Sequence, residues 1–297
     1  MSMPMPTTRP SGNNQQEFLT EVKKVFPEGA CDTHFHVFGQ AEEFPFIEDR
    51  SYTPPPASIG EYWSAFKALG VDRCVLVQPS VYGRDHSLLK QTLRRATPGS
   101  MRGVAVIFED TEDSEIEELH NLGVRGARCN ALFSGGVSAS NLQSIANRVK
   151  NLGWHIQLLV NVDTDPCLVE RVADMGVAVV VDHFGHPTYA SDINRSGIQN
   201  LRSLVKEGRA WVKLSGAYRL SGSASVTEPA AMPLARLFAD ANSNRILWGS
   251  DWPHPGFDRG SISSAELART FTHWIADEEI RKKASVANPS QLYWDIK

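Results

Sequence analysis

Short apolar runs alternate with amphipathic segments along most of this chain. Runs such as RCVLVQPS (73–80) and VAVVVDHFG (177–185) have the length and the β-branched content of strands buried on both faces. Between them lie segments such as SIGEYWSAFKALG (58–70), in which apolar residues return every three or four positions, the spacing of a helix with one buried face. The alternation predicts parallel strands joined by helices.

The strand–helix unit occurs eight times. We expect strands at 31–38, 73–80, 102–108, 124–130, 154–161, 177–185, 210–216 and 245–253, and helices at 58–70, 86–96, 113–123, 141–153, 166–176, 198–208, 228–241 and 264–275. Eight such units predict a (β/α)₈ TIM barrel, here a single domain over residues 28–297 whose last segment, 288–297, docks on the barrel. An open doubly wound sheet would show a glycine-rich dinucleotide fingerprint after the first strand, where this sequence has none.

Composition and the chain ends narrow the class of protein. Residues 1–27, rich in Pro, Ser, Asn and Gln, are predicted to form a flexible arm. A net charge of -4 argues against a nucleic-acid partner, and no apolar run approaches the ~20 residues of a membrane span. The start lacks the apolar core of a signal peptide, so we expect a cytoplasmic protein. For its assembly we expect a monomer or a small homo-oligomer. Its scattered cysteines are expected to be buried free thiols: Cys31, Cys74, Cys129 and Cys167.

Polar residues gather where the predicted strands end, which is where a barrel of this kind carries its chemistry. They are His34 and His36 toward the end of the first strand, Ser80 at the end of the second, Arg128 and Asn130 at the fourth, Asp182 and His183 at the sixth, Lys213 and Arg219 at or after the seventh, and Asp251 at the eighth. Alternate residues of a strand share a face, so the imidazoles of His34 and His36 should point the same way. His155, at the start of the fifth strand, lies at the opposite end and is interpreted as structural.

Four motifs carry a resemblance to a known family. They are DTHFHVFG (32–39), VVDHFGHP (180–187), ILWGSDWPHP (246–255) and NPSQLYW (288–294). Together they resemble the amidohydrolase superfamily, and within it the branch of pyrone-dicarboxylate lactonase and its sugar-lactone and muconolactone relatives. The resemblance implies a (β/α)₈ barrel and hydrolysis at a carboxyl or lactone carbon. It also implies catalytic roles for the matching residues His34, His36, His183 and Asp251.

The same resemblance bears on the substrate. Tyr52, Arg128 and Arg219 match residues that recognise substrate in the pyrone-dicarboxylate branch, and Ser80, Asn130 and His186 are further candidates for binding. The sequence departs from that branch elsewhere: His186 stands in place of an arginine, NALFSGG (130–136) lacks a basic pair, and LLVN (158–161) lacks a tyrosine. We therefore expect a small lactone or ester with one carboxylate, in aromatic or sugar-acid catabolism, rather than the pyrone dicarboxylate itself.

Opening a lactone needs a polarised carbonyl, a nucleophilic water and a proton for the leaving oxygen. Asp251 can accept the proton from water, and the histidines can polarise the carbonyl. Arg128 and Arg219 suit the planar recognition of a substrate carboxylate. The loop SGSASVTEPAAMP (221–233) is equally compatible with a mobile lid and with an exposed connection.

The metal requirement and three other functions stay open at the level of sequence. His34, His36 and Asp251, with His183 nearby, could hold one Zn or Mn ion. Metal-dependent proteins that resemble this chain generally add a ligand from the fourth or fifth strand. Here those strands end in RCN (128–130) and LLVN (158–161), without a lysine, glutamate or histidine at the expected place, so we expect that no metal is required. The main alternative is a metal-dependent decarboxylase of an aromatic or muconic-type acid. A phosphoesterase and a non-catalytic barrel that only binds a carboxylated ligand are the others.

Overall fold

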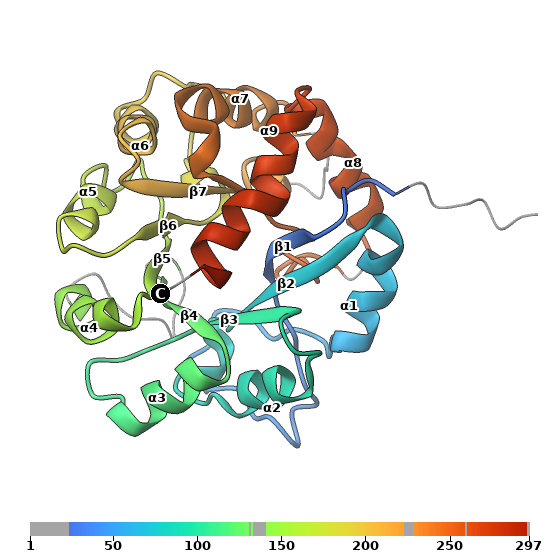
Figure 1. Ribbon diagram of the computed structural model, residues 1–297, viewed down its shortest axis with the longest axis vertical. Coiled ribbons are helices and arrows are strands. Elements are labelled where there is room, and N and C mark those ends of the chain that lie inside the picture. Colours follow the sequence, from blue (N-terminus) through green and yellow to red (C-terminus); the bar gives the residue numbers. More distant parts are fainter. Residues whose placement is uncertain (1–23, 131, 133–140, 223–227, 259, 296–297) are drawn as a thin grey trace, which may run out of the picture.

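The computed structural model describes residues 24–295 apart from 131, 133–140, 223–227 and 259, and it forms a barrel of eight parallel strands (Figure 1). Each strand pairs with the next one in the sequence. The strands are β1 Ala30–Phe35, β2 Val71–Val77, β3 Met101–Ala105, β4 Val124–Asn130, β5 His155–Leu159, β6 Val179–Val181, β7 Ala210–Leu214 and β8 Ile246–Trp248. The TIM barrel predicted from the hydrophobic pattern is confirmed.

Helices surround the strands as an outer ring in Figure 1. They are α1 Ile59–Phe66, α2 Ser87–Arg95, α3 Asp113–Asn121, α4 Leu142–Val149, α5 Leu168–Ala173, α6 Ser196–Lys206, α7 Ala231–Asn242, α8 Ser264–Trp274 and α9 Glu278–Lys282. The start of α1 shows how the sequence sets a boundary: the Ser58 side chain accepts from the N–H of Glu61, and the Glu61 carboxylate accepts from the N–H of Ser58. None of the helices in the described part of the chain is long and apolar enough to cross a membrane.

The barrel closes between β1 and the segment that follows β8. A parallel bridge joins Phe35 to Trp252, the N–H of His36 donates to the carbonyl of Trp252 at 2.7 Å, and the N–H of Asp251 donates to the carbonyl of His34 at 2.8 Å. The observed strand ends at Phe35, earlier than in the predicted strand 31–38, and its pairing with β2 has a register shift between Asp32 and Phe35. These closing hydrogen bonds set Asp251 beside the two histidines.

The barrel interior is filled with side chains, and its lower end is plugged by the tail. Inward-facing residues such as Val75, Val180 and Leu247 form one apolar cluster with Leu292 and Tyr293. Figure 1 shows the helical segment that begins at α9 crossing the barrel, and it continues in helical turns to residue 294. The docking predicted for the tail is confirmed for its described residues, so the other end of the barrel is where a ligand can enter.

Three predictions need correction or lie outside the described residues. Cys31, Cys74 and Cys129 are buried, but Cys167 is exposed, because it precedes α5 in a loop rather than lying on that helix's buried face. Residues 1–23 of the predicted arm and 223–227 of the predicted lid lie outside the described residues. The N–H groups of Val25 and Phe26 donate to the carbonyl of Leu69, so packing on the barrel includes the last residues assigned to the arm.

Candidate active site

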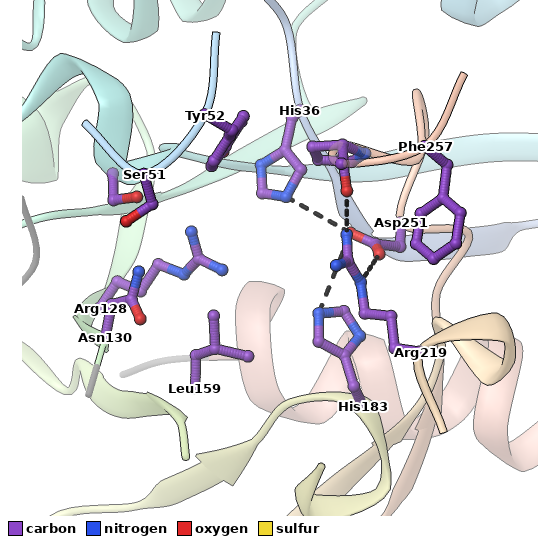
Figure 2. A pocket seen from close by; sticks show the side chains of 13 residues that line it. His36, Ser51, Tyr52, Arg128, Asn130, Leu159, His183, Arg219, Asp251 and Phe257 are labelled. Carbon is purple, nitrogen blue, oxygen red and sulfur yellow. Dashed lines mark hydrogen bonds and ion pairs between the residues drawn. The ribbon is translucent and has the colours of Figure 1, made fainter. Parts of the chain in front are cut away.

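A cavity of about 380 Å³ opens at the carboxyl ends of the strands (Figure 2). Eight of the predicted site residues line it: His36, Tyr52, Ser80, Arg128, Asn130, His183, Arg219 and Asp251. His34 is fully buried next to His36 and lies beneath the cavity wall. His186 lies outside the lining, with its ring centroid 6.5 Å from that of His183. Nearly all of the site residues predicted from the strand ends therefore lie around one cavity.

The two carboxylate oxygens of Asp251 have different environments. Oδ2 accepts hydrogen bonds from the Tyr218 hydroxyl and from Nε of Arg219, both at 2.6 Å. Oδ1 is buried and has no hydrogen-bond partner in the described structure; it lies 3.5 Å from Nε2 of His36 and 3.7 Å from Nε2 of His34. Burial by itself would raise the pKa of Asp251, but the Arg219 guanidinium holds this pKa well below its usual range. The residue is an ionised carboxylate with one oxygen held and one available.

Unusual backbone conformations aim these side chains. Asp251 and His183 have φ values of 57° and 51°, in the left-handed region that residues with a side chain seldom adopt. Gly216, at the end of β7, has φ 60°, and a Cβ there would lie 2.8 Å from Nδ1 of His183 and 3.3 Å from Oδ2 of Asp251. A glycine is therefore required for the two side chains to approach each other. Such positions cluster at active sites, where the surrounding structure holds the strain.

The tautomers of His34 and His36 follow from their hydrogen-bond partners. Nδ1 of His36 donates to the carbonyl of Val77 at 2.7 Å, and Nδ1 of His34 lies 3.2 Å from Oδ1 of Asp182, which can only accept. Both Nε2 atoms then carry lone pairs, and they lie 3.3 Å apart. Burial lowers the pKa of both imidazoles, that of His34 to well below its usual range. Two facing lone pairs beside a carboxylate oxygen favour a cation between them, either a proton or a metal ion.

The same three atoms fit a single divalent metal ion. Nε2 of His34, Nε2 of His36 and Oδ1 of Asp251 are separated by 3.3, 3.5 and 3.7 Å. Ligand atoms at about 2.1 Å from a tetrahedral zinc ion lie about 3.4 Å from one another. Oδ1 of Asp251, which has no hydrogen-bond partner among the described residues, is a suitable third ligand atom. The donor set therefore fits one zinc or manganese ion.

A buried charged network supports the histidines from below. Lys213 is fully buried; its Nζ donates to the carbonyl of Thr33 at 2.8 Å and to Oε1 of Gln157 at 2.7 Å, and lies 3.5 Å from Oδ1 of Asp182. Burial lowers the pKa of Lys213 to about 8. Burial would raise the pKa of Asp182, but His34 and Lys213 hold it well below its usual range. This network holds the Asp182 carboxylate beside Nδ1 of His34 and so fixes the orientation of the imidazole ring.

Sequence reasoning placed Asp182 and Lys213 at strand ends but gave them no role. The available signal was a charged residue inside an otherwise apolar strand, since a charge in such a place must be paired. Further lining residues were also missed: Leu159 at the end of β5, and the loop residues Ser51, Pro255, Gly256 and Phe257. No periodicity marks loop residues, so only the folded chain shows which of them reach the cavity.

One side of the cavity is suited to a substrate carboxylate. Figure 2 shows Arg128, Asn130 and Ser51 together, across the cavity from Asp251. Arg128 is buried; Nη1 donates to the carbonyl of Gln78 at 3.0 Å, and Nε has no hydrogen-bond partner within the described part of the chain. Nη2 of Arg128 also lies 3.7 Å from Oδ2 of Asp182. A buried guanidinium whose Nε has no partner among the described residues can still bind an anionic group. Arg219 also lines the cavity, but its Nε and Nη2 donate to Asp251 and to the carbonyl of Pro255.

Comparison with known proteins agrees with the fold and with the motifs. The model of the amidohydrolase family matches residues 31–294. The chain is 33% identical over 282 residues to a 2-pyrone-4,6-dicarboxylate hydrolase of Comamonas testosteroni, covering 90% of this chain and 91% of that protein. It is 31% identical over 290 residues to a 4-sulfomuconolactone hydrolase of Hydrogenophaga intermedia, covering 95% of this chain and 94% of that protein.

Solved structures give the same result. A Pseudomonas putida protein whose crystal structure carries the name 2-pyrone-4,6-dicarboxylic acid hydrolase is 31% identical and superposes with a TM-score of 0.79, over 90% of this chain and 98% of that one. The resemblance inferred from the four motifs is thus confirmed over nearly the whole chain. This protein belongs to the amidohydrolase family and is a hydrolase.

Proposed function

We propose that the enzyme opens the ring of a small lactone that carries one carboxylate. The observation that carries this proposal is the buried, ionised Asp251, whose Oδ1 lies across the cavity from Arg128. A base on one side and an anion-binding guanidinium on the other are what the hydrolysis of a carboxylated cyclic ester requires. The relatives named for hydrolysis of a pyrone dicarboxylate and of a sulfomuconolactone support the reaction class.

In the proposed reaction, Oδ1 of Asp251 takes a proton from water as the water oxygen bonds to the carbonyl carbon. The bond from that carbon to the ring oxygen then breaks, and the proton passes from Asp251 to the leaving oxygen. Nδ1 of His183 lies 2.9 Å from the Ser215 hydroxyl; if this hydroxyl donates, Nε2 of His183 carries a proton and can donate to the carbonyl oxygen. Arg219 keeps Asp251 ionised, and Arg128 holds the substrate carboxylate.

The proposed steps use groups of the chain itself, and we expect turnover without a metal. A metal ion bound at His34, His36 and Asp251 would act as a Lewis acid on the carbonyl oxygen or on water. Tyr52 lines the cavity, and burial raises its pKa to about 12, so it is a neutral hydrogen-bond donor to substrate. Ser80 and Asn130 are assigned to substrate binding from their places in the lining.

The proposal is tested with a panel of pyrone and furanone lactones, with and without a carboxylate. Opening of each ring releases a proton, which a pH indicator detects. Asp251→Asn keeps an oxygen that can accept from Tyr218 and Arg219 but removes the base, so turnover should fall by about a thousandfold or more while the circular dichroism spectrum of the folded protein is retained. Asp240→Asn, at an exposed carboxylate on α7 that does not line the cavity, is the matched control. Full activity of Asp251→Asn, or no hydrolysis of any carboxylated lactone, would contradict the proposal.

A further inference from the structure

A second cavity, of about 300 Å³, adjoins the first. The two cavities share four lining residues, namely Tyr52, Pro255, Gly256 and Phe257. A Cβ built on Gly256 would meet no atom within 4 Å, so the space beside this shared lining residue is open. A ligand in the first cavity can therefore extend into the second.

The second cavity is lined mainly by apolar groups. Phe38, Pro54, Ala57 and Pro253 form much of its wall. Its ionisable lining residues are His254 and Asp258 besides Tyr52, and no described lysine or arginine contributes to it. His254 is buried, and its Nδ1 lies 3.1 Å from the Tyr218 hydroxyl. The exposed carboxylate of Asp258 would repel an anion, and the cavity is therefore suited to an uncharged group.

The position of Phe257 relates the second cavity to the reacting centre. Its ring packs edge-on against Tyr218, with centroids 4.9 Å apart, and the Tyr218 hydroxyl donates to Asp251. Figure 2 shows Phe257 beside Asp251, on the side away from Arg128 and Asn130. A lactone with its carboxylate at Arg128 and its carbonyl near Asp251 directs the opposite part of its ring toward Phe257.

We propose that the second cavity binds an uncharged alkyl or aryl substituent on the lactone ring. The substrate class is then a lactone with one carboxylate and one apolar substituent, which deepens the proposed function and rests on it. The compounds named for two relatives, a pyrone dicarboxylate and a sulfomuconolactone, carry an additional anionic group instead. In this chain, both arginines that line the first cavity have protein partners, but Arg128 keeps an Nε with no partner among the described residues, whereas Nε of Arg219 donates to Asp251. An anion-binding group is therefore supplied on one side only.

The test compares four compounds as substrates of the unmodified enzyme. They are a pyrone monocarboxylate with hydrogen, propyl or phenyl on the ring carbon bonded to the ring oxygen, and the pyrone dicarboxylate with a second carboxylate at that carbon. We expect kcat/KM for the propyl and phenyl compounds to exceed that for the hydrogen compound by about tenfold or more, because apolar area is buried. We expect the dicarboxylate to be the poorest of the four.

A variant locates the effect. Thr53 is exposed and lines only the second of the two cavities, so Thr53→Trp should fill part of it. The variant should lower kcat/KM for the propyl and phenyl compounds about tenfold more than for the hydrogen compound. Thr97→Trp, at an exposed threonine just before β3 and thus near the opposite end of the barrel, should lower all of them equally or not at all.

Three outcomes would overturn the apolar subsite, and a fourth would count against the proposed function. Equal kcat/KM for the hydrogen, propyl and phenyl compounds, or preference for the dicarboxylate, would refute the apolar subsite while leaving lactone hydrolysis intact. An equal effect of Thr53→Trp on all compounds would mean that the substituent binds elsewhere. Hydrolysis of none of the four by an enzyme with native thermal melting would instead count against the proposed function itself.

Discussion

Nε2 of His34 and Nε2 of His36 lie 3.3 Å apart, and the Nδ1 atom of each ring is directed to an acceptor. Asp182 and the carbonyl of Val77 are those acceptors, so the lone pairs face each other beside Oδ1 of Asp251. Such an arrangement is stable with a positive charge between the rings. Whether a proton or a metal ion supplies this charge decides how the carbonyl is polarised and separates a metal-independent hydrolase from a metal-dependent decarboxylase.

Removal of metal should leave turnover nearly unchanged, within about twofold, because Asp251, His183 and Arg128 are groups of the chain. The measurement is lactone hydrolysis after dialysis against a strong chelator, with elemental analysis of the same sample. The chelated protein should nevertheless bind zinc, at one ion per chain in a titration, and His36→Gln should weaken that binding by about tenfold or more. Loss of activity on chelation with recovery on adding zinc would show that the metal is essential.

Arg128→Lys should raise KM for a carboxylated lactone roughly 10- to 100-fold with a smaller effect on kcat, because lysine keeps the charge but lacks the planar set of donors. Steady-state kinetics with a carboxylated lactone and with its uncharged analogue measure the effect. Arg84→Lys, at an exposed arginine bound to Asp110, is the matched control and should change neither constant. Equal loss with both lactones would mean that Arg128 does not recognise the carboxylate.

Lys213→Met and Asp182→Asn should each lower the free energy of unfolding by about 3–5 kcal/mol, because each leaves a buried charge with fewer partners. The double variant should lose less than the sum of the two losses, because the residues interact directly. Urea unfolding monitored by tryptophan fluorescence gives all three values. Additive losses would show that the charge pair, with Nζ 3.5 Å from Oδ1, contributes no coupling.

His155 should make the protein less stable as the pH falls. Its imidazole is fully buried against Gly126 and Tyr293, and burial lowers its pKa from 6.5 to about 3. Between these values the unfolded chain binds a proton that the folded chain does not, so the free energy of unfolding falls as the pH falls through about 6.5, by up to about 1.4 kcal/mol per pH unit. Above that pH, the contribution does not change.

Urea unfolding at about pH 6 and about pH 4 tests this linkage by comparing the unmodified protein with His155→Gln. The variant should lose less stability between the two pH values, whatever its absolute stability. Other titrating groups, including Asp32 with a pKa raised by burial to about 6, are common to both proteins and cancel in the difference. Identical pH slopes would mean that His155 is already protonated in the folded protein.

Much of this molecule is readable from local patterns. Strand and helix periodicities predicted the eight units and their order, because burial of one face of a helix or both faces of a strand is a requirement on nearby residues. The carboxyl ends of parallel strands meet at one end of a barrel, so His36, His183 and Asp251 could be grouped before any coordinates were known. Ser58 and Glu61 likewise mark the start of α1 through local capping.

Long-range contacts were not readable in this way. The pairing of Arg219 with Asp251, the position of Lys213 beneath His34 and the approach of Phe257 to Tyr218 join residues from different elements. Barrel closure sets these distances, and no periodicity encodes them. The sequence by itself determined the fold, the family and the residue types of the site. Only the tertiary structure decided which donors are already used, which carboxylate oxygen is available and where a second cavity opens, because these depend on distances between side chains far apart in the chain.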